Sequence, residues 1–211
     1  MKPVLYDYWR SSAAYRVRIA LNLAGLAYDR VMVDLLAGDQ QGAANLARNP
    51  QGLVPTLEID GLRLTQSVAI VEYLDQTRTL GFLPADAAGR ARVRALAFAV
   101  AMEIAPVCNL SVRNHAAAAS GGVITVEDWQ AHFISRGLAG LERMLDHPGT
   151  GRYCHGDSVT LADICLVPQL YNAERLGLEM AHYPRIAAIL ARLVALPAVQ
   201  AAHPDRHKPK G

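Results

Sequence analysis

The stretch VLYDYWRSSAAYRVRIALNLAG, residues 4–25, changes its hydrophobic period once along its length. Residues 4–8 alternate between apolar and polar side chains, as a β-strand does. After the segment WRSS the apolar residues recur at helical spacing: Ala13, Val17, Ala20, Leu21 and Ala24. Gly25 follows where a helix would need a C-terminal cap. The stretch therefore predicts a strand, a tight turn and a helix, in that order.

The remainder of the first 83 residues continues this alternation. The predicted elements are a strand over 28–33, a short helical or irregular connection over 42–48, strands over 56–59 and 62–64, and a helix over 67–75. Asp60-Gly61 between the last two strands is a strong signal for a two-residue hairpin. Because parallel strands joined by a helix require a right-handed crossover, this order predicts a small mixed sheet with helices packed on it.

Strand signals end at Pro84, and residues 83–86 have the composition of a linker. Residues 87–211 are rich in Ala, Leu and Arg with a period of 3.6 residues, which predicts an all-helical second domain. The predicted helices cover 87–118 with a kink at Pro106, 127–145, 160–176 and 184–193, Pro197 ends the series, and 203–211 form a frayed tail.

The composition is that of an ordinary globular protein. The chain has 211 residues, 52% hydrophobic and 19% charged, which excludes disordered, collagen-like and coiled-coil classes. The net charge is only +2, so nucleic acid is not an expected partner. The chain has three cysteines without a CxxC pair, no apparent leader and no membrane-spanning apolar run, so we expect a cytoplasmic protein. The histidines lack metal-binding spacing, so no metal is expected.

Ser11-Ser12 stands where the first predicted helix begins. Unpaired backbone N–H groups and the positive end of the helix dipole stabilise an anion or thiolate at such a position, and a serine hydroxyl can donate to sulfur. The simpler interpretation is that one of the two serines only caps the helix.

Two further dipeptides precede a strand and a helix. Val54-Pro55, with either a cis or a trans bond, would expose the Val54 backbone as a free edge for a peptide-like ligand. Gln66-Ser67 would combine an amide and a hydroxyl with free N–H donors into a carboxylate site. Taken singly, these are an ordinary loop and an ordinary cap. In the order thiol site, backbone edge and carboxylate site, the three features fit a γ-glutamyl tripeptide.

Nearly the whole chain resembles the zeta class of the glutathione transferases. The matching segments are YWRSS (8–12), RVRIAL (16–21), NP (49–50), VPTL (54–57), IDG (59–61), QS (66–67), IVEYL (70–74), NLSV (109–112), GD (156–157), TLAD (160–163), LVPQ (166–169), NAER (172–175) and HYP (182–184). The resemblance implies an α/β thioredoxin-like N-terminal domain over 1–83, an all-α C-terminal domain over 87–211 that forms the substrate pocket, glutathione as cofactor, and a homodimer.

The resemblance also assigns roles to individual residues. Ser11, Ser12 and Arg10 are the expected catalytic residues. The expected glutathione contacts are Ser12, Gln40, Val54, Gln66 and Ser67, and the expected substrate contacts are Arg10, Asn109 and Arg175. The segment from Thr160 to Asp163 is a capping box, whose expected role is structural.

The implied activity is the glutathione-dependent cis–trans isomerisation of maleylacetoacetate to fumarylacetoacetate, a step of aromatic amino acid catabolism. Ala13 stands where the family usually has a cysteine, which argues against reductive dehalogenation. Maleylpyruvate is the nearest alternative substrate, although Ala105 and Ser111 replace the histidine and arginine expected with it. Conjugation of small electrophiles such as α-halo acids, and a non-catalytic binding or stress protein, are further alternatives.

Overall fold

The computed structural model describes residues 2–209, which fall into two compact units. The first contains the residues up to Gly81 together with those from Ala195 onward, and the second is Phe82–Val194. The sequence placed everything from 87 to 211 in the helical domain. The structure differs at the C-terminus, because the residues after Ala195 pack against the first helix of the chain.

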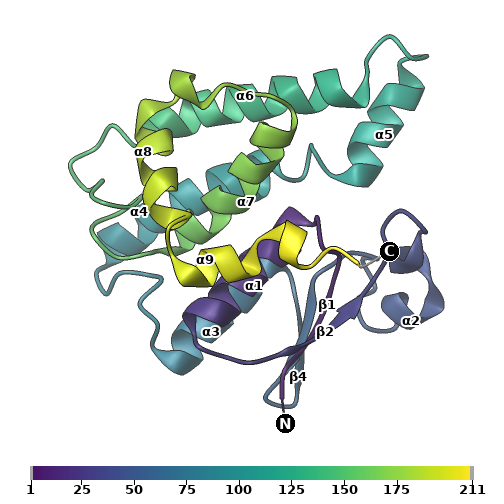
Figure 1. Ribbon diagram of the computed structural model, residues 1–211, viewed down its shortest axis with the longest axis horizontal. Helices are drawn as coiled ribbons and strands as arrows, with labels where there is room; N and C mark the ends of the chain where they lie inside the picture. Colours follow the sequence, from purple (N-terminus) through teal and green to yellow (C-terminus); the bar gives the residue numbers. More distant parts are fainter. Residues whose placement is uncertain (1, 210–211) are drawn as a thin grey trace. The chain divides into compact units, whose positions relative to one another are not determined.

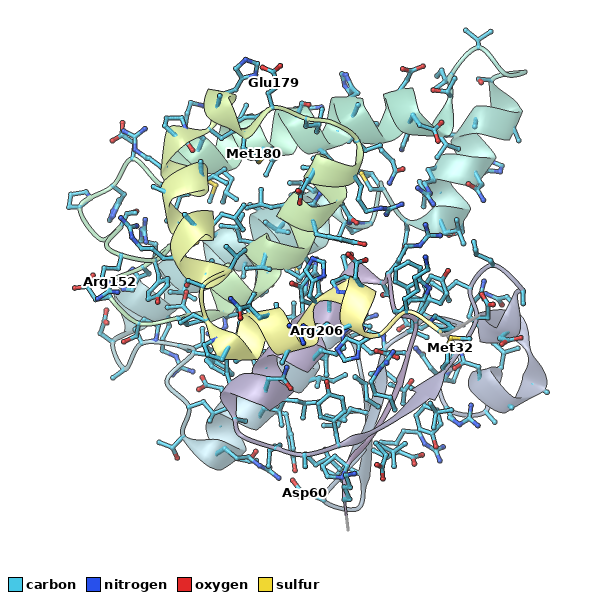
Figure 2. All side chains as sticks on the ribbon, viewed as in Figure 1. Met32, Asp60, Arg152, Glu179, Met180 and Arg206 are labelled. Carbon is cyan, nitrogen blue, oxygen red and sulfur yellow. The ribbon has the colours of Figure 1, made fainter. Side chains whose placement is uncertain are left out.

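The first unit is built on a four-stranded sheet in the order β2-β1-β3-β4. Its strands are β1 (Val4–Asp7), β2 (Asp29–Met32), β3 (Thr56–Ile59) and β4 (Leu62–Thr65). β1 runs parallel to β2 and antiparallel to β3, as a β-α-β unit followed by a hairpin requires. Asp60, labelled at the hairpin tip in Figure 2, and Gly61 both have positive φ, as the predicted two-residue turn needs. The predicted thioredoxin-like domain is confirmed.

The helices that follow β1, β2 and β4 in this part of the chain are α1 (Ser12–Leu23), α2 (Ala43–Leu46) and α3 (Ser67–Arg78). α1 and α3 pack side by side, as Figure 1 shows. Every residue of α1 from Ala14 to Leu21 is buried, including two arginines. The helix is covered on more than its predicted apolar stripe because α9 also packs against it.

The end of the chain forms a defined segment, which we call the C-terminal strap (residues 197–208). It begins with α9 (Pro197–Ala202), which lies alongside α1 (Figure 1), and continues through a 3₁₀ turn (Pro204–Arg206). Figure 2 labels Arg206 on this turn. The predicted frayed tail is thus wrong for residues 203–209, and its residues 210 and 211 lie outside the described residues. Pro197 begins a helix instead of ending the series, because the first helical position needs no N–H donor.

Hydrogen bonds attach the strap to the rest of the first unit. Asn22 Nδ2 donates to the Ala198 carbonyl over 3.0 Å. His207 contacts Arg30 Nη1 through Nδ1 (3.0 Å) and the Ala201 carbonyl through Nε2 (2.9 Å). A neutral imidazole satisfies both contacts, accepting from the arginine and donating to the carbonyl.

His207 makes the strap sensitive to acid. Burial, and then the nearby charges of Arg18 and Arg30, lower the pKa of His207 from 6.5 to about 4, against opposing contributions from the Ala201 carbonyl and Asp7. A histidine with a depressed folded-state pKa contributes stability above its unfolded pKa, and this contribution is lost as pH falls toward the folded pKa. The free energy of unfolding is therefore expected to decline between pH 6.5 and 4.

Urea unfolding at several pH values checks this expectation. His207→Gln keeps an acceptor and a donor but cannot take up the proton, so its free energy of unfolding should fall less than that of wild type over this pH range. His182→Gln, at an exposed histidine of the second unit, is the matched control and should follow wild type. Equal pH slopes for wild type and His207→Gln would contradict the assignment.

The second unit is helical, as predicted. Its helices are α4 (Ala87–Phe98), α5 (Leu110–Ala119), α6 (Val126–Met144), α7 (Leu161–Arg175) and α8 (Pro184–Leu193). The predicted single helix over 87–118 is wrong. α4 passes into a π-helical turn (Ala99–Ile104). The chain then leaves the helix, and α5 begins after Asn109, which stands at its N-cap position. Pro106 has no N–H to donate to the preceding turn, so the helix ends there where a kink was expected.

The predicted capping box at the start of α7 is confirmed. The buried Asp163 carboxylate accepts hydrogen bonds from Thr160 N (2.8 Å), Thr160 Oγ1 (2.7 Å) and Cys154 N (2.9 Å). It therefore fixes both the helix start and the loop before it. None of the helices among residues 2–209 is long and apolar enough to cross a membrane.

Candidate active site

The turn before α1 distinguishes the two serines. Ser11 N donates to the Tyr8 carbonyl over 3.0 Å, closing a β-turn, and Ser11 Oγ accepts from Ala14 N over 3.2 Å. Ser11 is thus the N-cap of α1. Ser12 is the first helical residue, is half-buried, and within residues 2–209 its hydroxyl has no hydrogen-bond partner. The capping interpretation holds for Ser11 alone, and the Ser12 hydroxyl remains available to a ligand at the positive end of α1.

The Val54-Pro55 peptide bond is cis. Val54 lies two residues before β3 begins at Thr56, and in the described part of the chain neither its N–H nor its carbonyl bonds to another backbone group. Asn49 Nδ2 donates to the Leu53 carbonyl over 3.0 Å and so holds the loop in place. The backbone N–H and carbonyl of Val54 are therefore available to a ligand.

The start of α3 is arranged differently from that of α1. Gln66 stands at the cap position with φ 66° and ψ 109°, and no side chain caps the helix. Among residues 2–209 the N–H groups of Ser67, Val68 and Ala69 find no backbone partner. Sparsely populated backbone conformations of this kind cluster at ligand sites. This helix start has no side-chain cap and three unbonded N–H donors. It therefore fits a site for a ligand carboxylate better than it fits the interpretation of Gln66-Ser67 as an ordinary cap.

Arg16 is a residue that the sequence reasoning missed. Its side chain is only 3% exposed, and Nη1 donates to Ser67 Oγ over 3.2 Å. Nε and Nη2 are buried and have no hydrogen-bond partner among the described residues. This cation adds to the positive potential at the start of α3, and the hydroxyl proton of Ser67 stays free for a ligand because its oxygen accepts from Arg16. An arginine on the apolar stripe that includes Ala13 and Val17 was the available signal.

Gln40 lies in a 3₁₀ turn (Asp39–Gln41) and is half-buried. Its backbone carbonyl accepts from Asn45 Nδ2 over 2.9 Å. Its side-chain Oε1 is buried and lacks a partner among residues 2–209. A buried acceptor without a donor is costly, so this amide is suited to an added N–H group.

The register of the sheet brings three of these features to one end. Tyr6 pairs with Thr56, and Thr56 pairs with Thr65. The end of β1, the start of β3 and the end of β4 are therefore neighbours, and each leads into one of the features. The turn from Tyr8 to Ser11 that leads into Ser12, which we call the serine turn, thus meets the Val54 edge and the start of α3 at the same end of the sheet. Arg10 lies in the serine turn, half-buried, with its guanidinium 5.1 Å from the Trp9 ring centroid.

The two predicted substrate residues of the second unit lie on different helices. Asn109 is the exposed N-cap residue of α5, and its side chain makes no capping hydrogen bond. Arg175 is the exposed last residue of α7, with its guanidinium 5.7 Å from the Tyr171 ring centroid. A cation and an amide with exposed side chains can both bind carboxylate oxygens.

The chain's own thiols are poor nucleophiles. Burial raises the pKa of Cys108 to about 11, and burial with the neighbouring Asp163 raises the pKa of Cys154 well above its ordinary value. Cys165 is fully buried. Since the thiolate is the reactive form, Cys108 and Cys154 are poor candidates for a nucleophile. Residues 2–209 contain no cluster of three or more His, Cys, Asp or Glu side chains that could hold a metal ion.

Two family models match the chain: the N-terminal domain of glutathione S-transferase over residues 1–76 and its C-terminal domain over 127–201. A maleylacetoacetate isomerase from Rhizobium meliloti (strain 1021) is 59% identical over 208 residues, with 98% of each chain covered.

Solved structures are similar over nearly the whole length. A holo structure of maleylpyruvate isomerase, described as a bacterial zeta-class glutathione S-transferase, matches with a TM-score of 0.93, 39% identity and 99% of each chain covered. A maleylacetoacetate isomerase from Methylobacterium extorquens AM1, with bound malonate and glutathione, matches with a TM-score of 0.92, 43% identity and 98% of each chain covered.

Proposed function

Because the chain belongs to the zeta class of the glutathione S-transferase family, we propose that it is a glutathione-dependent isomerase that converts maleylacetoacetate to fumarylacetoacetate. The observation that carries the proposal is the meeting of the serine turn, the Val54 edge and the start of α3 at one end of the sheet. The relative at 59% identity, named maleylacetoacetate isomerase, supports the substrate.

The residues of the first unit fit glutathione. Free N–H groups at the start of α3, Ser67 and Gln66 suit its γ-glutamyl carboxylate, beside the buried charge of Arg16. The Val54 backbone suits its peptide groups, and the Gln40 amide offers an acceptor. Ser12 suits its sulfur. Bound glutathione supplies a thiolate that adds reversibly to the maleyl double bond, so that rotation can yield the fumaryl product.

The side chains and helix start of this protein stabilise the negative charges of the glutathione thiolate and of the substrate. The Ser12 hydroxyl and the positive end of α1 stabilise the thiolate and lower its pKa. Ser11 maintains the helix start through its cap, so it acts on the same centre without touching sulfur. Arg10, Asn109 and Arg175 bind the substrate carboxylates and the negative charge that develops during the reaction.

Arg175→Ala is expected to weaken substrate use without changing glutathione affinity. Loss of a charge-assisted contact of about 1.5–3 kcal/mol corresponds to a drop of roughly 10- to 100-fold in kcat/KM. Steady-state kinetics with maleylacetone and calorimetric titration with glutathione separate the two effects. Arg136→Ala, at an exposed arginine of α6, is the matched control. If Arg175→Ala instead abolished glutathione binding, the arginine would not be a substrate contact.

Maleylpyruvate is the second candidate substrate, because the solved maleylpyruvate isomerase covers 99% of this chain. Ala105 and Ser111, both without charge, disfavour it. Proton NMR of the purified protein with maleylacetone or maleylpyruvate, with and without glutathione, tests the proposal. Glutathione-dependent isomerisation without thiol consumption supports an isomerase, and the faster substrate identifies the pathway. Consumption of glutathione by an electrophile, without isomerisation, would place the protein among the conjugating transferases.

We further propose a cytoplasmic homodimer that acts in aromatic amino acid catabolism, with residues 1–83 binding glutathione and the helices within residues 87–194 providing the substrate pocket. Free cysteines are consistent with a reducing compartment. Sedimentation velocity at micromolar concentration tests the oligomeric state, and a single species of about 23 kDa would exclude the dimer.

A further inference from the structure

The Arg18 guanidinium joins three segments of the first unit. It is fully buried, and its three nitrogens donate to three different places. Nη1 donates to Asp7 Oδ2 at the end of β1 over 2.6 Å, and Nη2 donates to the Trp9 carbonyl over 2.9 Å. Nε donates to the Ala202 carbonyl of the C-terminal strap over 3.1 Å. The planar fork of an arginine can satisfy three such acceptors at once, which a lysine cannot match in geometry.

The Trp9 carbonyl occupies a decisive position in the serine turn. Ser11 N bonds to the Tyr8 carbonyl, so the peptide between Trp9 and Arg10 is the central peptide of this β-turn. Turns of types I and II differ in the orientation of this central peptide. Arg10 is absent from the described non-glycine residues with positive φ, which excludes type II. The bond from Arg18 thus holds the central peptide in the orientation from which Ser11 and Ser12 continue into α1.

The surroundings keep Arg18 in place. Asp7 is fully buried and also accepts from Arg30 Nη2 over 2.7 Å, so its carboxylate lies between two arginines. The strap contacts the same turn a second time, since Lys208 Nζ lies 5.8 Å from the Trp9 ring centroid. A buried, multiply bonded arginine is held more rigidly than an exposed one, because fewer side-chain rotamers satisfy all of its hydrogen bonds.

We propose that Arg18 is a positioning residue for the isomerisation: through the Trp9 carbonyl it fixes the turn that presents Ser12, and the C-terminal strap completes this arrangement. The proposal rests on the proposed function of Ser12. It makes the C-terminal strap part of the machinery that activates glutathione, although the strap and Ser12 lie near opposite ends of the described chain.

Arg18→Lys tests the proposal. The lysine keeps a positive charge for Asp7 but cannot reproduce the bonds to both carbonyls. We expect kcat for maleylacetone to fall at least 10-fold, and the pKa of bound glutathione, followed by thiolate absorbance, to rise by about one unit. The KM for glutathione should change less than threefold, because the start of α3 is untouched. A purely structural role would not move the thiolate titration of protein that remains folded.

Arg63→Lys is the matched control, because Arg63 donates to a carboxylate (Glu58) and to a backbone carbonyl (Ala47), as Arg18 does, but bonds neither Trp9 nor the C-terminal strap. It is expected to keep the wild-type thiolate titration. The proposal is overturned if folded Arg18→Lys titrates and turns over like wild type, or if Arg63→Lys shows the same losses. Circular dichroism and thermal melting establish that each variant is folded.

A measurement on the wild-type protein covers the case in which Arg18→Lys does not fold. In protein with ¹⁵N-labelled arginine, the guanidinium signals of Arg18 should resist solvent exchange and shift when glutathione is added, while those of Arg30 shift less. Unchanged Arg18 signals on glutathione binding would contradict the proposal. These titrations need no maleyl substrate, so a wild-type protein that binds glutathione but does not isomerise maleylacetone would refute the proposed activity and leave the Arg18 test standing.

Discussion

Ser12→Ala is expected to lower kcat at neutral pH by about 100-fold, as removal of one preorganised donor to a developing or stabilised anion does in other enzymes. The Ser12 hydroxyl is free of other hydrogen bonds within residues 2–209, so its loss affects the ligand and leaves the fold intact. Without this donor the pKa of bound glutathione rises. The variant's rate should therefore recover toward the wild-type rate as pH increases.

The measurement is thiolate absorbance of the glutathione complex against pH, together with kcat for maleylacetone. Ser11→Ala is the matched control. It removes the bond to Ala14 N and should destabilise the protein by about 1 kcal/mol, the usual cost of a lost N-cap, with a much smaller shift in the thiolate pKa. If Ser11→Ala moved the titration and Ser12→Ala did not, the two assignments would be reversed.

Asp163→Ala is expected to lower the free energy of unfolding by about 3–5 kcal/mol, since it leaves two buried backbone donors and one hydroxyl without their acceptor. The donors are Cys154 N, Thr160 N and Thr160 Oγ1. Burial raises the pKa of the Asp163 carboxyl, so burying its negative charge does not by itself stabilise the fold. The destabilisation comes from the stranded donors.

Chemical denaturation measures this loss. Asp157→Ala is the matched control, because Asp157 lies in the same loop, is exposed, and accepts from Arg152 N. It should cost no more than about 1 kcal/mol, as one exposed hydrogen bond does. Equal losses from the two aspartates would show that the buried capping box does not anchor α7.

Elements governed by near neighbours could be predicted from the sequence. The strand, turn and helix over residues 4–25, the Asp60-Gly61 hairpin and the Thr160 capping box are each indicated by the pattern of residues within a few positions of one another. The resemblance of motifs such as RVRIAL and NAER added the family and the expected site residues. The start of α3 lacks the side-chain cap that local preferences suggest, and its unbonded backbone donors remain for the carboxylate that we propose binds there.

Proline signals were ambiguous for a physical reason. A proline lacks an N–H, so it can end a helix or occupy the first helical position, where no donor is needed. Pro197 does the second although the sequence predicted the first, and Pro106 ends a helix where a kink was predicted. Whether a proline ends a helix or begins one depends on how the following segment packs against distant elements. The residues next to the proline in sequence do not show this.

The sequence alone determined the family, the two kinds of structure along the chain and the serine turn, because these depend on local pattern and on motifs. The tertiary structure alone decided which serine is free, why two arginines of α1 are buried and where the chain's end lies. Arg16 finds its acceptor in Ser67, and Arg18 finds one 184 residues away in Ala202. A buried cation requires partners, and only the fold brings together partners so distant in sequence.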